Sequence, residues 1–210
     1  MMTHPELATP RSRLDPRLFD VCALLSDAAS TFVEEVHTLA DEEYEAWIDT
    51  NAYSGNWQVF PFFVAHAAAN QVYDMESNRR RCPRTAALLE PLPRVHIASF
   101  SRLLPGTRLP PHTDFPKEGI LRIHVGLRGG EHAKFELDGE VVKLKPGELL
   151  IFDHSLPHTS YNDGTAPRDL LLVDYEVSDE ERRTLVSLRG GVNLGPTATA
   201  RPDPHYKEPE

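Results

Sequence analysis

Apolar side chains recur at every third or fourth position in the first part of the chain, which places them on one face of a helix. The clearest run follows Asp15-Pro16, which fits an N-cap and a proline in the first helical turn. Asp41 could cap a second, shorter helix that carries Tyr44, Trp47 and Ile48. Residues 51–63 predict a loop with one strand, and residues 64–75 and 83–89 predict further helices. The first apolar face consists of Leu18, Val21, Leu25, Ala28, Phe32, Val36 and Leu39.

After Pro93 the apolar period shortens to two, which is the period of a β-strand. Turn dipeptides such as Pro105-Gly106 separate the strands, and Asp138-Gly139 predicts a tight hairpin. Many short strands with helices gathered at the ends favour an α+β chain built on a jelly-roll or barrel. The predicted strands cover residues 95–104, 121–127, 134–137, 140–144, 149–153 and 169–177.

The chain is expected to form a single domain of three parts. Residues 1–92 form a helical segment that supports the barrel, and residues 93–190 form the catalytic core. Ser178 and Glu181 fit a capping box for a last helix within that core, ending at Gly190-Gly191. Residues 191–210 form a tail rich in proline, threonine and charge, which is expected to be loose.

Composition excludes several classes of protein. The net charge of −10 argues against a nucleic-acid backbone binder and against docking on anionic lipid. No apolar run is long enough to span a membrane, and the N-terminus has no secretory signal. The two cysteines, Cys22 and Cys82, are too few for a disulfide framework. We therefore expect a cytoplasmic protein with reduced thiols.

One predicted strand, residues 121–127, has two unlike faces. Its apolar face consists of Leu121, Ile123, Val125 and Leu127, and its other face carries Arg122 and His124. If the apolar face packs against the N-terminal helices, Arg122 and His124 line the barrel interior, where a ligand would be their natural partner. The alternative is a half-exposed strand whose polar face lies in water.

Half of the ten histidines fall between residues 112 and 158. His112-Thr113-Asp114 is a His-x-Asp pair placed after a predicted strand and turn, and His158 follows another predicted strand. Two histidines and one carboxylate on a barrel rim form the facial triad that binds Fe(II) and leaves coordination sites open. Arg168 stands at the head of the last predicted strand and could hold the distal carboxylate of a ketoacid bound to that iron. Arg102 is the next candidate for this role.

Residues of about 80–190 resemble the aspartyl/asparaginyl β-hydroxylase family of Fe(II)/2-oxoglutarate oxygenases. No single motif is specific, but their order and spacing are. The resembling stretches are Cys82-Pro83-Arg84-Thr85-Ala86-Ala87-Leu88-Leu89, Ser101-Arg102-Leu103-Leu104-Pro105-Gly106-Thr107, Pro111-His112-Thr113, Leu121-Arg122-Ile123-His124-Val125-Gly126-Leu127, Pro146-Gly147-Glu148-Leu149-Leu150-Ile151-Phe152-Asp153 and the strand after Arg168.

The resemblance implies a double-stranded β-helix, an iron site and a 2-oxoglutarate site. It makes His112 and His158 metal ligands, and Arg122 a clamp for a substrate carboxylate. The residues implied to contact 2-oxoglutarate are Ser101, His124 and Arg168. Asp114 departs from the animal enzymes, which have glycine there, and is similar to bacterial members that hydroxylate free amino acids. The expected partners are therefore O2 and a small amino-acid-type substrate that is free, peptide-linked or carrier-bound.

Two other functions fit parts of the same pattern. His158-Thr159-Ser160-Tyr161-Asn162 matches the tail of a plain cupin motif, which would indicate a metal dioxygenase or isomerase that needs no ketoacid. Arg168 argues against this, because such an enzyme has no use for a ketoacid clamp. A non-catalytic small-ligand-binding barrel is the second alternative, and the complete triad argues against it. His154 is a weaker candidate for a ligand or for a partner of one, and Asp153 could orient His158.

Overall fold

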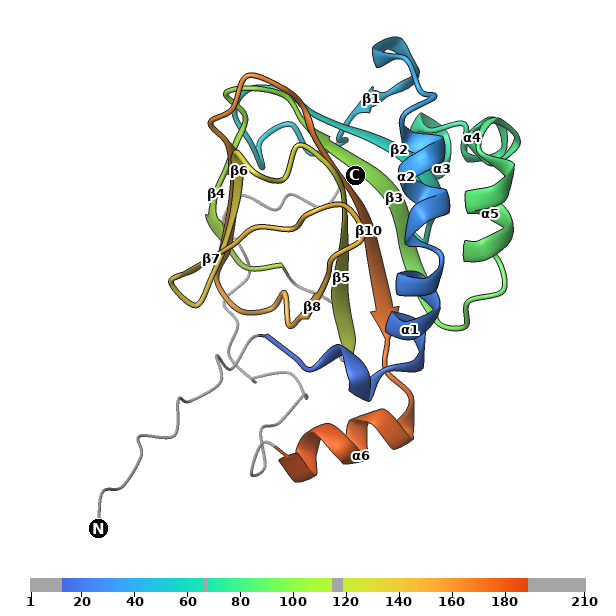
Figure 1. The fold of residues 1–210 in the computed structure, drawn as a ribbon, viewed down its shortest axis with the longest axis vertical. Coiled ribbons are helices and arrows are strands. Elements are labelled where there is room, and N and C mark those ends of the chain that lie inside the picture. The colour runs from blue at the N-terminus through green and yellow to red at the C-terminus, as the bar shows by residue number, and fades with distance from the viewer. Residues whose placement is uncertain (1–12, 66–67, 115–118, 189–210) are drawn as a thin grey trace.

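Two antiparallel β-sheets face each other and form the body of the protein (Figure 1). The computed structural model describes residues 13–65, 68–114 and 119–188. The large sheet has the strand order β1 (Glu45–Ala46), β2 (Trp57–Val64), β3 (Val95–Leu103), β10 (Arg168–Glu176), β5 (Ile120–Arg128), β8 (Leu149–Phe152). The small sheet has the order β4 (Arg108–His112), β9 (His158–Asn162), β6 (Ala133–Leu137), β7 (Glu140–Val142).

From β3 onward the chain passes back and forth between the sheets. Strands β3, β5, β8 and β10 lie in the large sheet, while β4, β6, β7 and β9 lie in the small one. This path is that of a double-stranded β-helix, and with the helices it confirms the predicted α+β fold class. The Asp138-Gly139 hairpin between β6 and β7 is also confirmed, with positive φ angles of 52° and 77° at its two turn residues.

Helices cover the outer face of the large sheet (Figure 1). Phe32 and Val36 of α2 belong to the same buried cluster as Ile123 and Val125 of β5. Of the two alternatives for this strand, the structure shows the first: the apolar face of β5 packs against the helices, and its polar face turns toward the space between the sheets. The helices are α1 (Asp20–Asp27), α2 (Ala29–Val36), α3 (Ala69–Val72), α4 (Met75–Arg81), α5 (Pro83–Leu89) and α6 (Asp179–Leu188), with 3₁₀ turns η1 (Pro16–Leu18) and η2 (Asp41–Glu43).

Two N-terminal predictions were wrong in detail. No helix carries residues 44–48, because Glu43 turns back to accept the Ala40 N–H at 2.8 Å and the chain then pairs with β2. Val64 is not helical but the last residue of β2, where it pairs with Ile97 of β3. In both places pairing with a distant strand outweighs local helical spacing. The segment 1–92 thus contributes β1 and β2 to the large sheet.

Two strands of the small sheet were not predicted. β4 contains Pro110 and Pro111, which remove backbone donors, and β9 consists mostly of polar residues. Each pairs with the other, and β9 also pairs with β6. The capping box of α6 is confirmed by reciprocal hydrogen bonds between Ser178 and Glu181. Gly190-Gly191 and the predicted tail lie outside the described residues.

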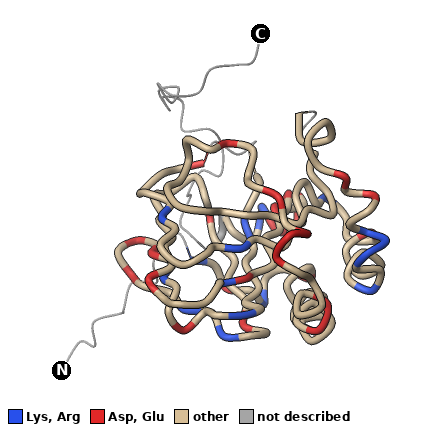
Figure 2. The backbone as a smooth tube through the Cα atoms, turned by 90° about the horizontal axis from the view of Figure 1, so that it is seen from above, with Lys and Arg blue, Asp and Glu red and all other residues tan. Residues whose placement is uncertain are grey.

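Acidic and basic side chains are interspersed along the described chain (Figure 2). The three consecutive arginines of α4 are the most concentrated basic segment of the described chain, and each has a hydrogen-bond or ion-pair partner. Arg79 donates to the Phe62 carbonyl, Arg80 pairs with Glu76, and Arg81 pairs with Glu43 at 2.6 Å. This segment is thus tied to its neighbours.

Among the described helices, none has the length and apolar character needed to cross a membrane.

Candidate active site

A cavity of about 250 Å³ lies between the two sheets. Strands of both sheets line it, and it contains every residue that the sequence singled out for iron, cosubstrate and substrate. A more open hollow of about 740 Å³, lined in part by Tyr73, Asp74 and His96, contains none of them. The inner cavity is therefore the candidate site. Its predicted members are Ser101, His112, Asp114, Arg122, His124, His158 and Arg168.

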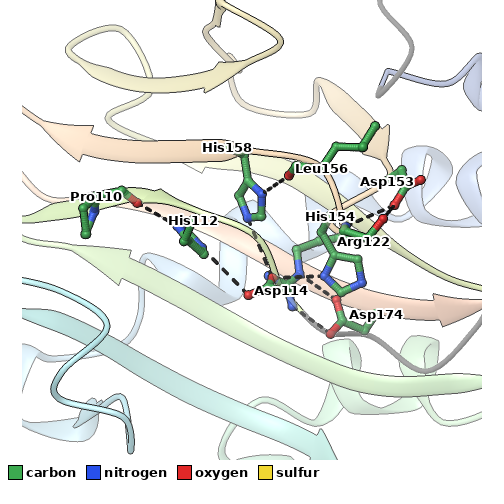
Figure 3. A network of polar contacts seen from close by, with 10 residues as sticks. Pro110, His112, Asp114, Arg122, Asp153, His154, Leu156, His158 and Asp174 are labelled. Carbon is green, nitrogen blue, oxygen red and sulfur yellow. Dashed lines mark hydrogen bonds and ion pairs between the residues drawn. The ribbon is translucent and has the colours of Figure 1, made fainter. Parts of the chain in front are cut away.

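The metal-ligating groups meet because β4 pairs with β9. His112 and His158 lie opposite each other in this ladder, and their ring centroids are 4.2 Å apart. Asp114 follows β4, and its carboxylate faces both rings (Figure 3). Its carboxylate oxygens lie 3.8 Å from His112 Nε2 and 3.7 Å from His158 Nε2. One ligand atom from each residue falls within 4.8 Å of the others.

Backbone carbonyls orient both histidine rings. His112 Nδ1 donates to the Pro110 carbonyl at 2.8 Å, and His158 Nδ1 donates to the Leu156 carbonyl at 2.9 Å. A carbonyl can only accept, so each Nδ1 carries a proton, and Nε2, the ring nitrogen on the side of Asp114, is the atom that each ring can offer to a metal. Burial lowers the pKa of His158 to about 4, which keeps it neutral at pH 7. This donor set fits a divalent metal bound by two histidines and one carboxylate.

Asp114 is held as an anion by its neighbours. Burial alone would raise its pKa, but the Arg122 guanidinium and the hydrogen bond from His154 outweigh burial and hold the pKa well below its usual range. His154 Nδ1 lies 3.1 Å from Asp114 Oδ2, and the Asp114 N–H donates to the His154 carbonyl at 3.0 Å. His154 is thus placed as a partner of the candidate ligand Asp114.

Arg122 lines the cavity, as its place on β5 predicts, but its guanidinium is already occupied. Nε and Nη2 form a fork with the two oxygens of Asp174 at 2.7 and 2.9 Å, and Nη1 binds Asp114 Oδ2 (Figure 3). Asp174 was missed at the sequence level. The available signal was an acid that follows the apolar run Leu170-Leu171-Leu172-Val173 of β10, where a buried charge requires a partner. The substrate-clamp role of Arg122 stays a prediction.

Arg168 lies elsewhere in the same cavity and has no carboxylate partner within ion-pair distance among the described residues. It is buried, and its Nη2 donates to Ser160 Oγ at 2.5 Å. Burial lowers its pKa to about 10, which leaves the guanidinium charged at pH 7. A buried cation with so little compensation is costly unless an anion binds beside it.

The other two residues expected at the cosubstrate differ in environment. Ser101 Oγ accepts a hydrogen bond from Trp57 Nε1 at 2.9 Å. His124 is packed edge-on against Phe135 and Phe152, and its buried Nδ1 has no hydrogen-bond partner in the described part of the chain. Burial, with Arg168 and Arg122 nearby, holds the pKa of His124 well below its ordinary value. A neutral histidine with unmet hydrogen-bonding capacity beside Arg168 fits a bound carboxylate-bearing molecule.

Arg102, the second candidate for the ketoacid clamp, and Asp153, a candidate to orient His158, do not line the cavity. Arg102, another arginine of the motif region, is fully buried, pairs with Asp169 at 2.8 Å and covers the Tyr44 ring at 3.6 Å. Asp153 does not orient His158, because it accepts from the N–H and Oγ of Ser155 at 3.0 and 2.6 Å. The lining of the cavity also includes Trp47 and Trp57, stacked with ring centroids 5.0 Å apart, to which the sequence analysis assigned no role.

Comparison with known proteins agrees with this class of fold and site. A family model described as Aspartyl/Asparaginyl beta-hydroxylase matches residues 23–177. The chain therefore belongs to the aspartyl/asparaginyl β-hydroxylase family, and the predicted family resemblance is confirmed. The match also extends over the N-terminal helices, where no resemblance was evident from the motifs.

Two curated relatives illustrate the range of the family. The chain is 34% identical over 103 residues to an ornithine lipid ester-linked acyl 2-hydroxylase from Rhizobium tropici, a match covering 48% of this chain and 36% of the relative. It is 33% identical over 157 residues to aspartate beta-hydroxylase domain-containing protein 2 from Xenopus tropicalis, covering 69% and 40%. The matched part is thus about two fifths or less of the length of these relatives.

Solved structures are similar in fold only. A Pseudomonas putida prolyl-4-hydroxylase aligns over 73% of this chain and 88% of its own, with a TM-score of 0.45 and 16% identity. A 2OG-Fe(II) oxygenase-family oxidoreductase from Burkholderia pseudomallei aligns over 70% and 77%, with a TM-score of 0.45 and 11% identity.

Proposed function

We propose that this protein is an Fe(II)- and 2-oxoglutarate-dependent hydroxylase that acts on an unactivated C–H bond of a small substrate. One observation carries the proposal: a convergent His112, Asp114 and His158 set shares one cavity with Arg168, a buried cation that lacks a carboxylate partner among the described residues. The first feature suits a metal with open coordination sites, and the second suits the distal carboxylate of a ketoacid.

The residues of this chain divide the work between binding and orientation. His112, Asp114 and His158 would hold Fe(II), while Arg168, with Ser160 beside it, would bind the distal carboxylate of 2-oxoglutarate. Ser101 and His124 would complete the cosubstrate pocket. Bound together, iron and 2-oxoglutarate supply the oxidation of a C–H bond by O2, with succinate and carbon dioxide as co-products. Apolar residues such as Leu170 and Leu172 restrict water in the cavity.

For the substrate we propose a small molecule of amino-acid type, free, peptide-linked or carrier-bound, in line with the family. The lining favours a second candidate as well. Much of the cavity wall is apolar, including Trp47, Trp57, Val59 and Ile97. Such a wall suits a hydrocarbon group, and the Rhizobium relative is named for an acyl chain. An acylated amino-acid derivative would satisfy both considerations.

A coupled assay tests the function and the substrate class together. Purified protein with Fe(II), ascorbate and 2-oxoglutarate is given free amino acids, the same residues in capped peptides, and N-acyl and O-acyl amino acids. We expect one of these classes of compound to accelerate succinate release, and the compound that is turned over to gain 16 Da, the mass of one oxygen atom. Metal-dependent turnover of substrate without 2-oxoglutarate would favour the cupin-type alternative. Ligand binding without turnover of any compound would favour the binding barrel.

Asp114→Gly is expected to weaken metal binding more than it removes chemistry. It deletes one of three ligand atoms, and changes outside the ligand set alone can reach roughly 10–100-fold in metal affinity. We expect the Fe(II) dissociation constant, measured anaerobically by calorimetry, to rise about 10-fold or more. Asp49→Asn, which changes another carboxylate lining the same cavity, is the control. An unchanged affinity in Asp114→Gly would remove Asp114 from the ligand set.

A further inference from the structure

Arg122 is bound on both sides by acids of this chain. Its side chain is 15% exposed, and the side chain of Asp174 is 7% exposed. Asp174 takes the Nε and Nη2 donors in a forked pair, and Asp114 takes Nη1. A forked arginine–carboxylate pair fixes the guanidinium plane as well as its position. The pair with Asp174 therefore directs Nη1, the third nitrogen of the guanidinium, toward Asp114.

The contacts to Asp114 are unequal at its two oxygens. Each oxygen approaches one candidate histidine, Oδ1 at 3.8 Å from His112 Nε2 and Oδ2 at 3.7 Å from His158 Nε2. Oδ2 also accepts from Arg122 and from His154 Nδ1, whereas Oδ1 accepts no hydrogen bond from the described residues. His154 is itself buried, and its carbonyl accepts the Asp114 N–H. Two donors and a backbone hydrogen bond thus restrain the carboxylate through Oδ2 and the backbone, while the lone pairs of Oδ1 are left for a metal (Figure 3).

We infer that Arg122 is a positioning residue, held by Asp174, that fixes Asp114 so that Oδ1 is the oxygen offered to the metal. This inference rests on the proposed iron site and assigns Arg122 a role other than clamping a substrate carboxylate. Orientation matters because a metal ligand that must first be ordered on binding lowers the affinity. Asp174, which does not touch the ligand set, acts through Arg122.

The same contacts bear on how substrate is held. Among the described residues that line the cavity, the arginines are Arg122 and Arg168. Arg122 is neutralised by two carboxylates, and Arg168 is assigned to the cosubstrate. A substrate carboxylate would therefore have to displace Asp114 from Arg122. We expect the substrate to be selected by its fit to the cavity wall instead.

Metal titration tests the inference without relying on turnover. The probe is Co(II), which accepts the same histidine and carboxylate ligands and reports their geometry by visible absorption. We expect Arg122→Ala to raise the Co(II) dissociation constant roughly 10-fold and to change the spectrum. Asp174→Asn should raise the Co(II) dissociation constant by a smaller factor and change the spectrum in the same direction. In an Asp114→Gly background, adding Arg122→Ala should change the affinity by less than about twofold, because the group that it positions is gone.

Arg128→Ala is the matched control, because Arg128 lies on the same strand and pairs with an acid of β10, Asp169, without lining the cavity. Its Co(II) affinity should equal that of wild type. Thermal unfolding is measured to check that each variant is folded. If Arg122→Ala does not fold, the Co(II) affinity and spectrum of Asp174→Asn decide the test. A raised substrate KM with unchanged Co(II) affinity and spectrum would overturn the inference. Wild-type protein that binds no Co(II), or binds it equally after His158→Ala, would overturn the proposed function as well.

Discussion

His158→Ala and His112→Ala are each expected to abolish turnover and to remove tight metal binding. Each deletes one of two Nε2 donors that face Asp114. The remaining pair has a single imidazole, the ligand type that suits iron, whereas Asp114→Gly keeps both imidazoles. We expect no succinate above the background rate and no calorimetric signal for Fe(II) at micromolar metal. The loss should be larger than that of Asp114→Gly, because both histidines are already locked in the ligating tautomer.

His132→Ala is the control for this pair, because it makes the same substitution at an exposed histidine outside the cavity. Its activity and metal affinity should equal those of wild type. His158 also packs against Phe135 and Phe152, so unfolding midpoints are measured for every variant. Full activity in folded, metal-loaded His112→Ala or His158→Ala would exclude that residue from the metal centre.

Arg168→Ala should raise the 2-oxoglutarate concentration needed for half-maximal rate by roughly 30-fold or more. Breaking a buried, hydrogen-bonded charge pair costs on the order of 2–5 kcal/mol, and 2 kcal/mol is about 30-fold in affinity. Arg168→Lys should recover only part of the loss, because an ammonium lacks the planar fork of a guanidinium. The assay is succinate release at saturating substrate across a 2-oxoglutarate series.

The stability of Arg168→Ala separates a binding role from a structural one. In the absence of ligand, Arg168 is a buried cation whose described hydrogen bond is to Ser160. Removing an uncompensated charge should leave the unfolding midpoint unchanged or higher. The 2-oxoglutarate requirement should nevertheless rise. An unchanged requirement would contradict the assignment. Arg102, the next candidate from the sequence, is committed to Asp169 and Asp41.

The periodicity of the chain determined much of the fold. Alternation in residues 121–127 identified a strand with one apolar face, and that face packs under the helices. The Asp-Gly turn placed the β6–β7 hairpin correctly, because both of its residues tolerate positive φ. Family motifs confirmed by the family match then supplied the candidate residues of the site. These features are local, and a single segment contains the information that specifies each of them.

The tertiary structure alone decided which candidates meet and what surrounds them. β4 and β9 carry His112 and His158, yet neither has a strand-like pattern, because each is a strand through pairing with other strands: β4 with β9, and β9 with both β4 and β6. Asp174, 52 residues along the chain, occupies the fork of Arg122, the residue expected to clamp a substrate. Among the described residues, Arg168 has no such carboxylate partner. The sequence does not show which of these two arginines is neutralised, because the acid that neutralises a buried cation is chosen by strand register across the sheet, not by spacing along the chain.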